Sequence, residues 1–140
     1  MSAVTIQAAI IDDAAIIAEY DKHISADAIR TKINRGEVFV AYSTFGDQTF
    51  VGWLRYSLFW DSIPFMNMLF LLPENRGKGI GRQLVQYWES RMKERGYAKV
   101  LTSTQQNEFA QHFYVALGYT AIGGFAMSSD PYELLFEKIL

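Results

Sequence analysis

The stretch Pro73-Glu74-Asn75-Arg76-Gly77-Lys78-Gly79-Ile80-Gly81-Arg82 determines how we interpret this chain. The apolar run at 64–72 precedes it and is typical of a central strand, which Pro73 ends because proline cannot donate to a sheet ladder. Apolar residues then recur four apart from Ile80 to Met92, which predicts an amphipathic helix. The segment therefore predicts a strand, a glycine-rich loop and a helix in direct succession.

The loop has the composition of an anion site. Its three glycines allow a ligand to approach the backbone closely, and the start of the following helix offers unpaired N–H groups and the positive end of a dipole. These features favour phosphate. A solvated turn before the helix is the alternative, but three cations at the same place favour the phosphate site. The glycines are Gly77, Gly79 and Gly81, and the cations are Arg76, Lys78 and Arg82.

The sequence of this loop does not match two familiar phosphate-binding motifs. A Walker A loop requires Ser or Thr after its lysine, and Gly79 follows Lys78 here. The dinucleotide fingerprint that starts at Gly77 requires a sixth-position glycine, and Arg82 stands there. The predicted phosphate site therefore belongs to neither of these two classes of loop.

The flanking sequence predicts a mixed α/β fold of class α+β, with a strand–loop–helix–strand crossover at its centre. Short helices are expected after Asp12 or Asp13, and between an N-cap at Ser25 and a left-handed terminus at Gly36. A further helix is expected at 107–117. Strands are expected at 4–10, 38–42, 50–59, 64–72, 99–104, 119–126 and 132–139, with 38–42 and 50–59 forming an antiparallel hairpin.

Length and composition narrow the function classes. The chain has 140 residues, half of them apolar, which suits a single domain over residues 1–140. A net charge of −2 argues against a broad nucleic-acid-binding face. There is no cysteine, no signal-peptide pattern and no apolar run long enough to span a bilayer. We expect a soluble cytoplasmic protein without nucleic-acid, membrane or metal partners.

The helix expected at 107–117 contains a second group of candidate functional residues. Asn107 and Tyr114 lie seven residues apart, so that two helical turns place them on one face, while Phe109 and Phe113 add apolar contacts. Periodicity alone favours an ordinary core role for Tyr114, with its hydroxyl at the rim of the core. The same helix contains His112, which is expected at the surface or in packing.

The loop and this helix together resemble the GCN5-related N-acetyltransferase (GNAT) superfamily. The acetyl-CoA loop of that superfamily reads Arg/Gln-x-x-Gly-x-Gly/Ala, and Arg76–Gly81 matches it in full. A later motif places an asparagine before Phe-Tyr-x-x-Leu-Gly-Tyr, which Asn107 and Phe113–Tyr119 match. The resemblance covers nearly the whole chain. It implies a mostly antiparallel central sheet flanked by helices, with splayed central strands that hold acetyl-CoA as co-substrate.

The resemblance also implies roles for individual residues. The backbone of Arg76–Arg82 would hold the pyrophosphate of acetyl-CoA, and Asn107 would hydrogen-bond the pantetheine. Leu69, Phe70 and Leu71 would pair with the pantetheine arm as with an added strand, which commonly carries a bulge in this superfamily. A backbone N–H there would polarise the thioester carbonyl. Tyr114 would protonate the leaving thiolate as a general acid.

The sequence departs from the commoner superfamily pattern at the general base. Many members place a glutamate on the strand before the loop, but 65–68 contains no carboxylate. Asn67 can orient a water or the acceptor, yet it cannot take a proton at neutral pH. Asp61, Glu108 and His23 are the other candidates, so the base stays unassigned.

The acceptor side is less specific. Trp60 and Asp61 form an aromatic face beside a carboxylate, which suits an ammonium group, and an ordinary turn explains them equally well. Phe65, Asn67 and His23 are further candidates for this side. The acceptor is expected to be an amine of a small molecule or a peptide.

Three readings remain. The first is an acetyl-CoA-dependent N-acetyltransferase that acts on a primary amine. The second is a catalytically weak or inactive CoA-binding sensor or interaction module, which the missing carboxylate keeps open. The third is an enzyme that acetylates aminoacyl-tRNA, which the acidic balance disfavours. A homodimer is open, because relatives are often dimers.

Overall fold

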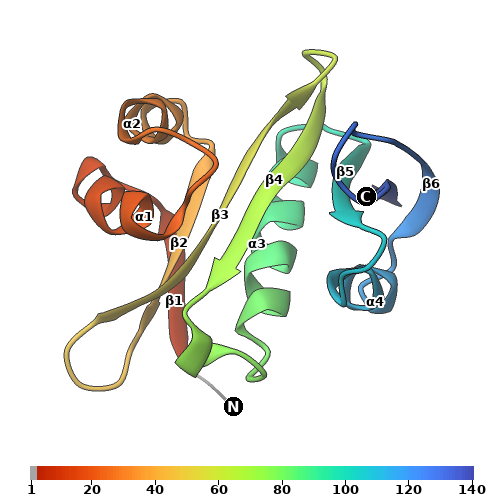
Figure 1. The fold of residues 1–140 in the computed structure, drawn as a ribbon. Helices are drawn as coiled ribbons and strands as arrows, with labels where there is room; N and C mark the ends of the chain where they lie inside the picture. Colours follow the sequence, from red (N-terminus) through yellow and green to blue (C-terminus); the bar gives the residue numbers. More distant parts are fainter. Residues whose placement is uncertain (1–2) are drawn as a thin grey trace. The chain divides into compact units, whose positions relative to one another are not determined.

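The computed structural model describes residues 3–140, and Figure 1 shows the path of the chain through its helices and strands. The strands of these residues pair in the order β1-β2-β3-β4-β5-β7-β6 in one mixed sheet. The strands are β1 (Val4–Ala8), β2 (Val38–Ser43), β3 (Thr49–Phe59), β4 (Ile63–Leu71), β5 (Lys99–Gln105), β6 (Thr120–Phe125) and β7 (Glu133–Ile139). The α-helices are α1 (Ala14–Tyr20), α2 (Ala26–Asn34), α3 (Ile80–Glu94) and α4 (Ala110–Ala116), with 3-10 turns at Ile11–Asp13 and Pro73–Asn75. The expected strands are all present, with small differences at their ends.

The described chain forms two compact units. The first unit comprises the chain up to Tyr56 and Met68–Trp88, and the second comprises Ser57–Asn67 and Glu89–Leu140. The strand β4 and the helix α3 each contribute residues to both units. The glycine-rich loop belongs to the first unit, whereas Tyr114 belongs to the second.

In the first unit, helices cover both faces of the sheet. Successive residues of β2 point to opposite faces, as the period of a strand requires. Val38 and Val40 pack with Ile17 of α1 and Ile29 of α2 in one buried cluster. The ring of Phe39 instead meets Tyr87 of α3 edge-on, with centroids 5.2 Å apart. The predicted apolar stripe of α3 is buried as expected.

The predicted ends of α2 are confirmed. The hydroxyl of Ser25 accepts a hydrogen bond from the N–H of Ala28 at 3.1 Å, which makes it the N-cap. Gly36 follows the helix with φ +74°, a conformation that glycine adopts without a steric penalty.

A buried ion pair joins the first two helices to the sheet. Arg55 of β3 donates from Nε to Asp21 Oδ2 at 2.7 Å and from Nη2 to Oδ1 at 3.3 Å, and both residues are buried. Asp21 Oδ1 also accepts from the backbone N–H of His23 at 3.1 Å. The connection between α1 and α2 is therefore held against β3 by paired charges.

In the second unit, β5 pairs antiparallel with β7, and β7 with β6, while β4 pairs parallel with β5 at Phe65↔Leu101 and Met66↔Thr102. The turn between β3 and β4 has φ values of 54° at Trp60 and 58° at Asp61. Two left-handed central residues are typical of a type I′ hairpin turn, where Asn-Gly is the usual pair. A bulky tryptophan in that conformation carries backbone strain.

We predict that Asp21→Ala lowers the free energy of unfolding by about 3–5 kcal/mol, because Arg55 would keep a buried, unpaired charge. The matched control is Asp27→Ala, which removes the exposed pair between Asp27 and Arg30 and should cost less than about 1 kcal/mol. Urea unfolding followed by circular dichroism measures both values. Equal losses in the two variants would contradict this account of the buried pair.

Candidate active site

The glycine-rich loop leaves β4 through a 3-10 turn and is tied back to the strand. Arg76 donates from Nε to the carbonyl oxygen of Leu71 at 2.9 Å, and its guanidinium lies 5.2 Å from the centroid of the Phe70 ring. Gly77 and Gly79 have φ values of +74° and +83°. Residues with a Cβ rarely adopt these values, so the path of the loop depends on glycine at both positions.

The start of α3 provides backbone donors at the end of this loop. Gln83 donates its N–H to the carbonyl of Gly79 at 3.2 Å, so Ile80, Gly81 and Arg82 have no acceptor for their N–H groups within the helix. Apart from each glycine and its two chain neighbours, no heavy atom of the described residues lies within 4 Å of where a Cβ on Gly77 or Gly79 would stand. The loop therefore has the open backbone, the donors and the positive charge that a pyrophosphate requires.

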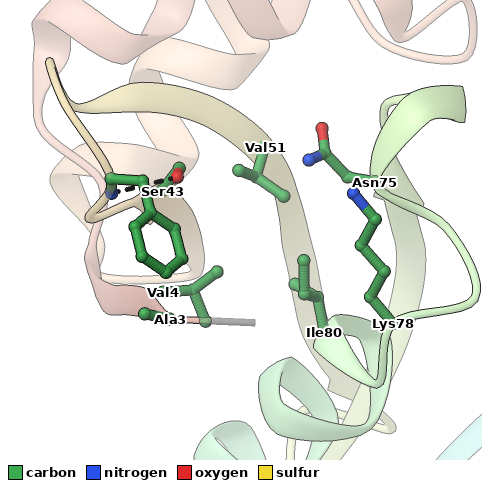
Figure 2. A pocket seen from close by; sticks show the side chains of 8 residues that line it. Ala3, Val4, Ser43, Val51, Asn75, Lys78 and Ile80 are labelled. Carbon is green, nitrogen blue, oxygen red and sulfur yellow. Dashed lines mark hydrogen bonds between the residues drawn. The ribbon is translucent and has the colours of Figure 1, made fainter. Parts of the chain in front are cut away.

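A cavity of about 170 Å³ borders the loop on the side of β1 and β2 (Figure 2). Val4, Val51 and Ile80 give it apolar walls, and Figure 2 shows the side chains of Lys78 and Asn75 next to each other at one side. One cation of the loop therefore stands beside a hollow of the first unit.

The end of β4 approaches β3 unusually closely at Gly52. A Cβ on Gly52 would fall inside contact distance of the Phe70 carbonyl oxygen, 2.6 Å from Leu71 Cδ2 and 3.1 Å from Leu71 Cα. Only glycine allows this approach. Gly52 thus sets the position of the Phe70–Leu71 backbone, which the resemblance assigns to the pantetheine arm.

The side-chain alternation of β4 is interrupted in its middle. Asn67 donates from Nδ2 to the hydroxyl of Ser57 at 2.7 Å, and Met68 packs against the cluster that contains Trp53. Positions 53 and 57 share a face of β3, whereas neighbours in a regular strand point to opposite faces. Asn67 and Met68 break this rule, which indicates a β-bulge between them. A bulge leaves a backbone group outside the regular ladder.

In the second unit, Tyr114 of α4 is only 6% exposed. Its hydroxyl lies close to the side chain of Thr102, whose Oγ1 donates its only proton to the carbonyl of Met66 at 3.1 Å. Burial raises the pKa of Tyr114 to about 12. The phenol therefore keeps its proton at neutral pH and lies close to the paired segments of β4 and β5.

The predicted shared face of Asn107 and Tyr114 is wrong. The helix begins at Ala110, and Asn107 lies exposed in the turn before it. The Gln111 side chain donates to the carbonyls of Gln106 and Glu108 at 2.7 and 3.1 Å, which stabilises a turn in place of another helical turn. Phe109 is 88% exposed and does not supply the predicted apolar contact.

The candidate acceptor residues fall into separate groups. In the second unit, the Phe59 ring lies 4.7 Å from Trp60 and 6.1 Å from Phe65, centroid to centroid, so three aromatic rings line the β3–β4 hairpin. Trp60 is 78% exposed, and Asp61 is its exposed neighbour in the turn. In the first unit, His23 is exposed and contacts Asp21 through its backbone.

The structure contains buried polar groups that the sequence patterns did not predict. The main ones are the Arg55–Asp21 pair and a carboxylate, Glu89 of α3, which pairs with Tyr119 and Lys138. A charge inside an apolar strand, as at Arg55, was the available signal, because such a residue requires a partner. Among residues 3–140, no acidic or histidine cluster could hold a metal ion, and no helix is long and apolar enough to cross a membrane.

Comparison with known proteins identifies the family. The family model described as "Acetyltransferase (GNAT) family" matches residues 8–119. This chain belongs to the GNAT acetyltransferase family. A comparison with curated proteins gave no match.

Solved structures share the fold. Ard1 from Thermoplasma volcanium superposes with a TM-score of 0.83 at 15% identity, covering 99% of this chain and 98% of its own. The PaiA N-acetyltransferase from Thermoplasma acidophilum, solved with coenzyme A, gives 0.78 at 20% identity, with 99% of both chains covered. A GNAT-family acetyltransferase from Bacillus cereus gives 0.78 at 22% identity, with 98% and 97% covered. At such identities the likeness concerns the fold.

We predict that Gly52→Ala weakens acetyl-CoA binding by about tenfold or more, because the added Cβ displaces the Phe70–Leu71 backbone. A tenfold loss of affinity corresponds to about 1.4 kcal/mol of binding free energy. The matched control is Gly124→Ala, whose Cβ would meet the Glu133 carbonyl in the β6–β7 hairpin in the same way. Isothermal titration calorimetry on the folded fractions measures both affinities. Equal effects on binding would contradict the role of Gly52.

We predict that alkali destabilises the protein through its buried tyrosines. Burial raises the pKa of Tyr114 to about 12, and burial with the neighbouring carboxylates Asp13 and Glu89 raises the pKa of Tyr42 and Tyr119. An unfolded tyrosine titrates near pH ~10, so the native state retains protons above that pH that the unfolded chain releases. The contribution of the protonated, buried tyrosines to the free energy of unfolding is therefore complete below pH ~10 and is lost as the pH rises toward about 12.

Urea unfolding at pH 8, 9, 10 and 11 tests this pH dependence. The free energy of unfolding should fall above pH ~10, and the fall should be smaller in Tyr114→Phe, which lacks one of the titrating groups. A free energy that stays level to pH 11 would contradict the burial of these phenols.

Proposed function

We propose that this chain is an acetyl-CoA-dependent N-acetyltransferase that transfers an acetyl group directly to a primary amine of a small molecule or peptide, and that residues 1–140 act as one domain. The observation that carries this proposal is the loop between β4 and α3, with left-handed Gly77 and Gly79 and an open helix start. Membership of the GNAT family and the coenzyme A bound to PaiA support it.

Acetyl-CoA would supply the activated acetyl group as a thioester. The loop residues would bind its pyrophosphate through backbone N–H groups and three cations, namely Arg76, Gly77, Lys78, Gly79, Ile80, Gly81 and Arg82. Leu69, Phe70 and Leu71 would offer backbone groups to the pantetheine arm, and Asn107 its side-chain amide. A backbone N–H at the β4 bulge would stabilise the oxyanion during transfer.

The transfer forms a bond from the amine nitrogen to the carbonyl carbon and breaks the bond from that carbon to sulfur. Tyr114 would donate a hydrogen bond to the sulfur as negative charge develops there. A phenol with a pKa of about 12 is a weaker acid than a thiol with a pKa of about 8.5, so this hydrogen bond is more important than full proton transfer. The amine nitrogen loses one proton and the departing thiolate takes up one, so the products are an amide and a free thiol.

The acceptor amine must lose a proton before it attacks. Asn67 uses its amide nitrogen to bind Ser57 and cannot serve as a base. Glu108 accepts a hydrogen bond from the Gln105 N–H at 3.2 Å as part of the turn before α4. The general base therefore stays unassigned, and an acceptor amine with a low pKa needs only a water to take its proton.

The acceptor would be bound by the aromatic side chains of the β3–β4 hairpin. Phe65 and Trp60 present rings that suit an ammonium group or an apolar chain beside it, and Asp61 adds a negative charge. The strained left-handed conformation of Trp60 supports a functional rather than a purely structural turn. His23 is the candidate from the first unit.

A CoA-binding sensor is the second candidate function, which the missing carboxylate at 65–68 favours. The proposed cytoplasmic location is supported by the lack of cysteine, which suits reducing conditions. The support for a homodimer is the edge strand β6, whose six residues are all exposed.

The proposal predicts that free thiol appears from acetyl-CoA in the presence of one class of amine. The experiment offers polyamines, amino acids, aminoglycosides and peptides with free amino termini or lysines, and follows thiol release. With the best acceptor, Tyr114→Phe should lower kcat by about 10²-fold and leave acetyl-CoA affinity unchanged. Acetyl-CoA binding without release for any amine would favour the sensor. An unchanged kcat would make Tyr114 structural.

A further inference from the structure

A buried carboxylate connects three elements of the second unit behind Tyr114. Glu89 of α3 is 8% exposed and accepts a hydrogen bond from the Tyr119 hydroxyl at 2.7 Å. Lys138 of β7 donates to the other Glu89 oxygen at 3.0 Å, and its ammonium lies 5.7 Å from the centroid of the Tyr119 ring. The network therefore joins α3, the residue before β6, and β7.

Such a network is weak evidence for a gain in stability, because desolvating a carboxylate is costly and a well-packed apolar group in place of a buried ion pair is often at least as stable. The hydrogen bonds instead give the Tyr119 ring a defined orientation. Tyr119 is 3% exposed, so the ring has no solvent-facing alternative.

Tyr119 in turn is fixed to Tyr114. The N–H of Tyr119 donates to the Tyr114 carbonyl at 3.0 Å, which closes the end of α4. The two rings meet edge-on with centroids 5.6 Å apart, and Phe136 of β7 lies 6.2 Å from the Tyr114 ring. Tyr119 thus contacts Tyr114 through the backbone and through the ring, while Glu89 fixes the far end of Tyr119.

We propose that Glu89, Tyr119 and Lys138 form a positioning network that holds the phenol of Tyr114 in the geometry needed for acetyl transfer. This inference rests on the proposed function, since it assigns these residues a role in placing the hydrogen-bond donor to the leaving sulfur. A small displacement of a reacting group lowers the rate strongly; about 1 Å can cost about 10²-fold. The three residues touch neither reactant in this scheme, so they are positioning residues.

The test is a double-mutant cycle on thiol release with the best acceptor. Tyr119→Phe keeps the ring and removes only the hydroxyl that Glu89 binds, and we expect kcat to fall about tenfold with KM for acetyl-CoA unchanged. In a Tyr114→Phe background the same change should have no further effect, because its target is gone. A general structural role would lower kcat by the same factor in both backgrounds.

Two further variants separate the hydrogen bond from the fold. Glu89→Gln keeps an acceptor for the Tyr119 hydroxyl and should retain more of kcat than Glu89→Ala. Tyr132→Phe, which changes a half-exposed tyrosine of the same unit, should leave kcat unchanged. Glu89→Gln kcat equal to that of Glu89→Ala would overturn the role of the hydrogen bond.

A readout without acetyl-CoA completes the test. In protein labelled at the tyrosine Cζ carbon, the Tyr114 signal is assigned by its loss in Tyr114→Phe. Wild-type Tyr114 should show no ionisation below pH ~11, whereas in Tyr119→Phe the signal should begin to titrate closer to pH ~10 as water gains access. Identical titration curves would overturn the proposal.

The outcomes distinguish this inference from the proposed function. If Tyr114→Phe lowers kcat but Tyr119→Phe matches the wild type, the network has no positioning role and the acetyltransferase assignment stands. If Tyr114→Phe leaves kcat unchanged while thiol is released, the role of Tyr114 and the network both fail. If no amine supports thiol release, the proposed function fails, and the titration curves alone decide whether the network holds Tyr114.

Discussion

The central constraint in this structure is the left-handed backbone at Gly77 and Gly79, where the chain leaves β4 and starts α3. The first N–H groups of α3 have no helical partners, and the space around Gly77 and Gly79 just before them is open. Arg76 ties the loop back to Leu71, so the glycine-rich loop and the end of β4 form one local structure. Gly52 then fixes the same end of β4 from the other side. Under the proposed function, the binding of acetyl-CoA would depend on these few backbone positions.

Local signals explain which parts of the fold could be predicted. Ser25, Gly36 and the four-residue spacing of α3 act within one or two turns of chain, and the structure confirms all three. The match of Arg76–Gly81 to a family loop likewise requires no knowledge of distant contacts. The prediction failed at Asn107, where the Gln111 side chain stabilises a turn at the point where periodicity alone would continue a helix.

Interactions between distant residues explain what the sequence did not reveal. Arg55 pairs with Asp21, which lies 34 positions away in the sequence, and Glu89 pairs with Lys138, which lies 49 positions away. Nothing in a local pattern identifies such partners, although a charge within an apolar strand or beside an apolar helix stripe indicates that one exists. These buried polar groups hold the α1–α2 connection and Tyr119, next to segments that the proposed function uses. Under the proposed function, this polar burial would orient Tyr114 as well as contribute to packing.

The most direct test compares acetyl-CoA with S-acetylpantetheine, which lacks both the pyrophosphate and the phosphorylated adenosine, by isothermal titration calorimetry with wild type, Gly79→Val and Gly36→Val. The last variant imposes the same backbone strain away from the loop. If the loop binds pyrophosphate through several charge-assisted hydrogen bonds, the wild type should bind acetyl-CoA at least about 100-fold more tightly than S-acetylpantetheine. The Gly36→Val variant should keep this preference, and the Gly79→Val variant should lose it. Equal affinities for the two ligands in the wild type would contradict the account.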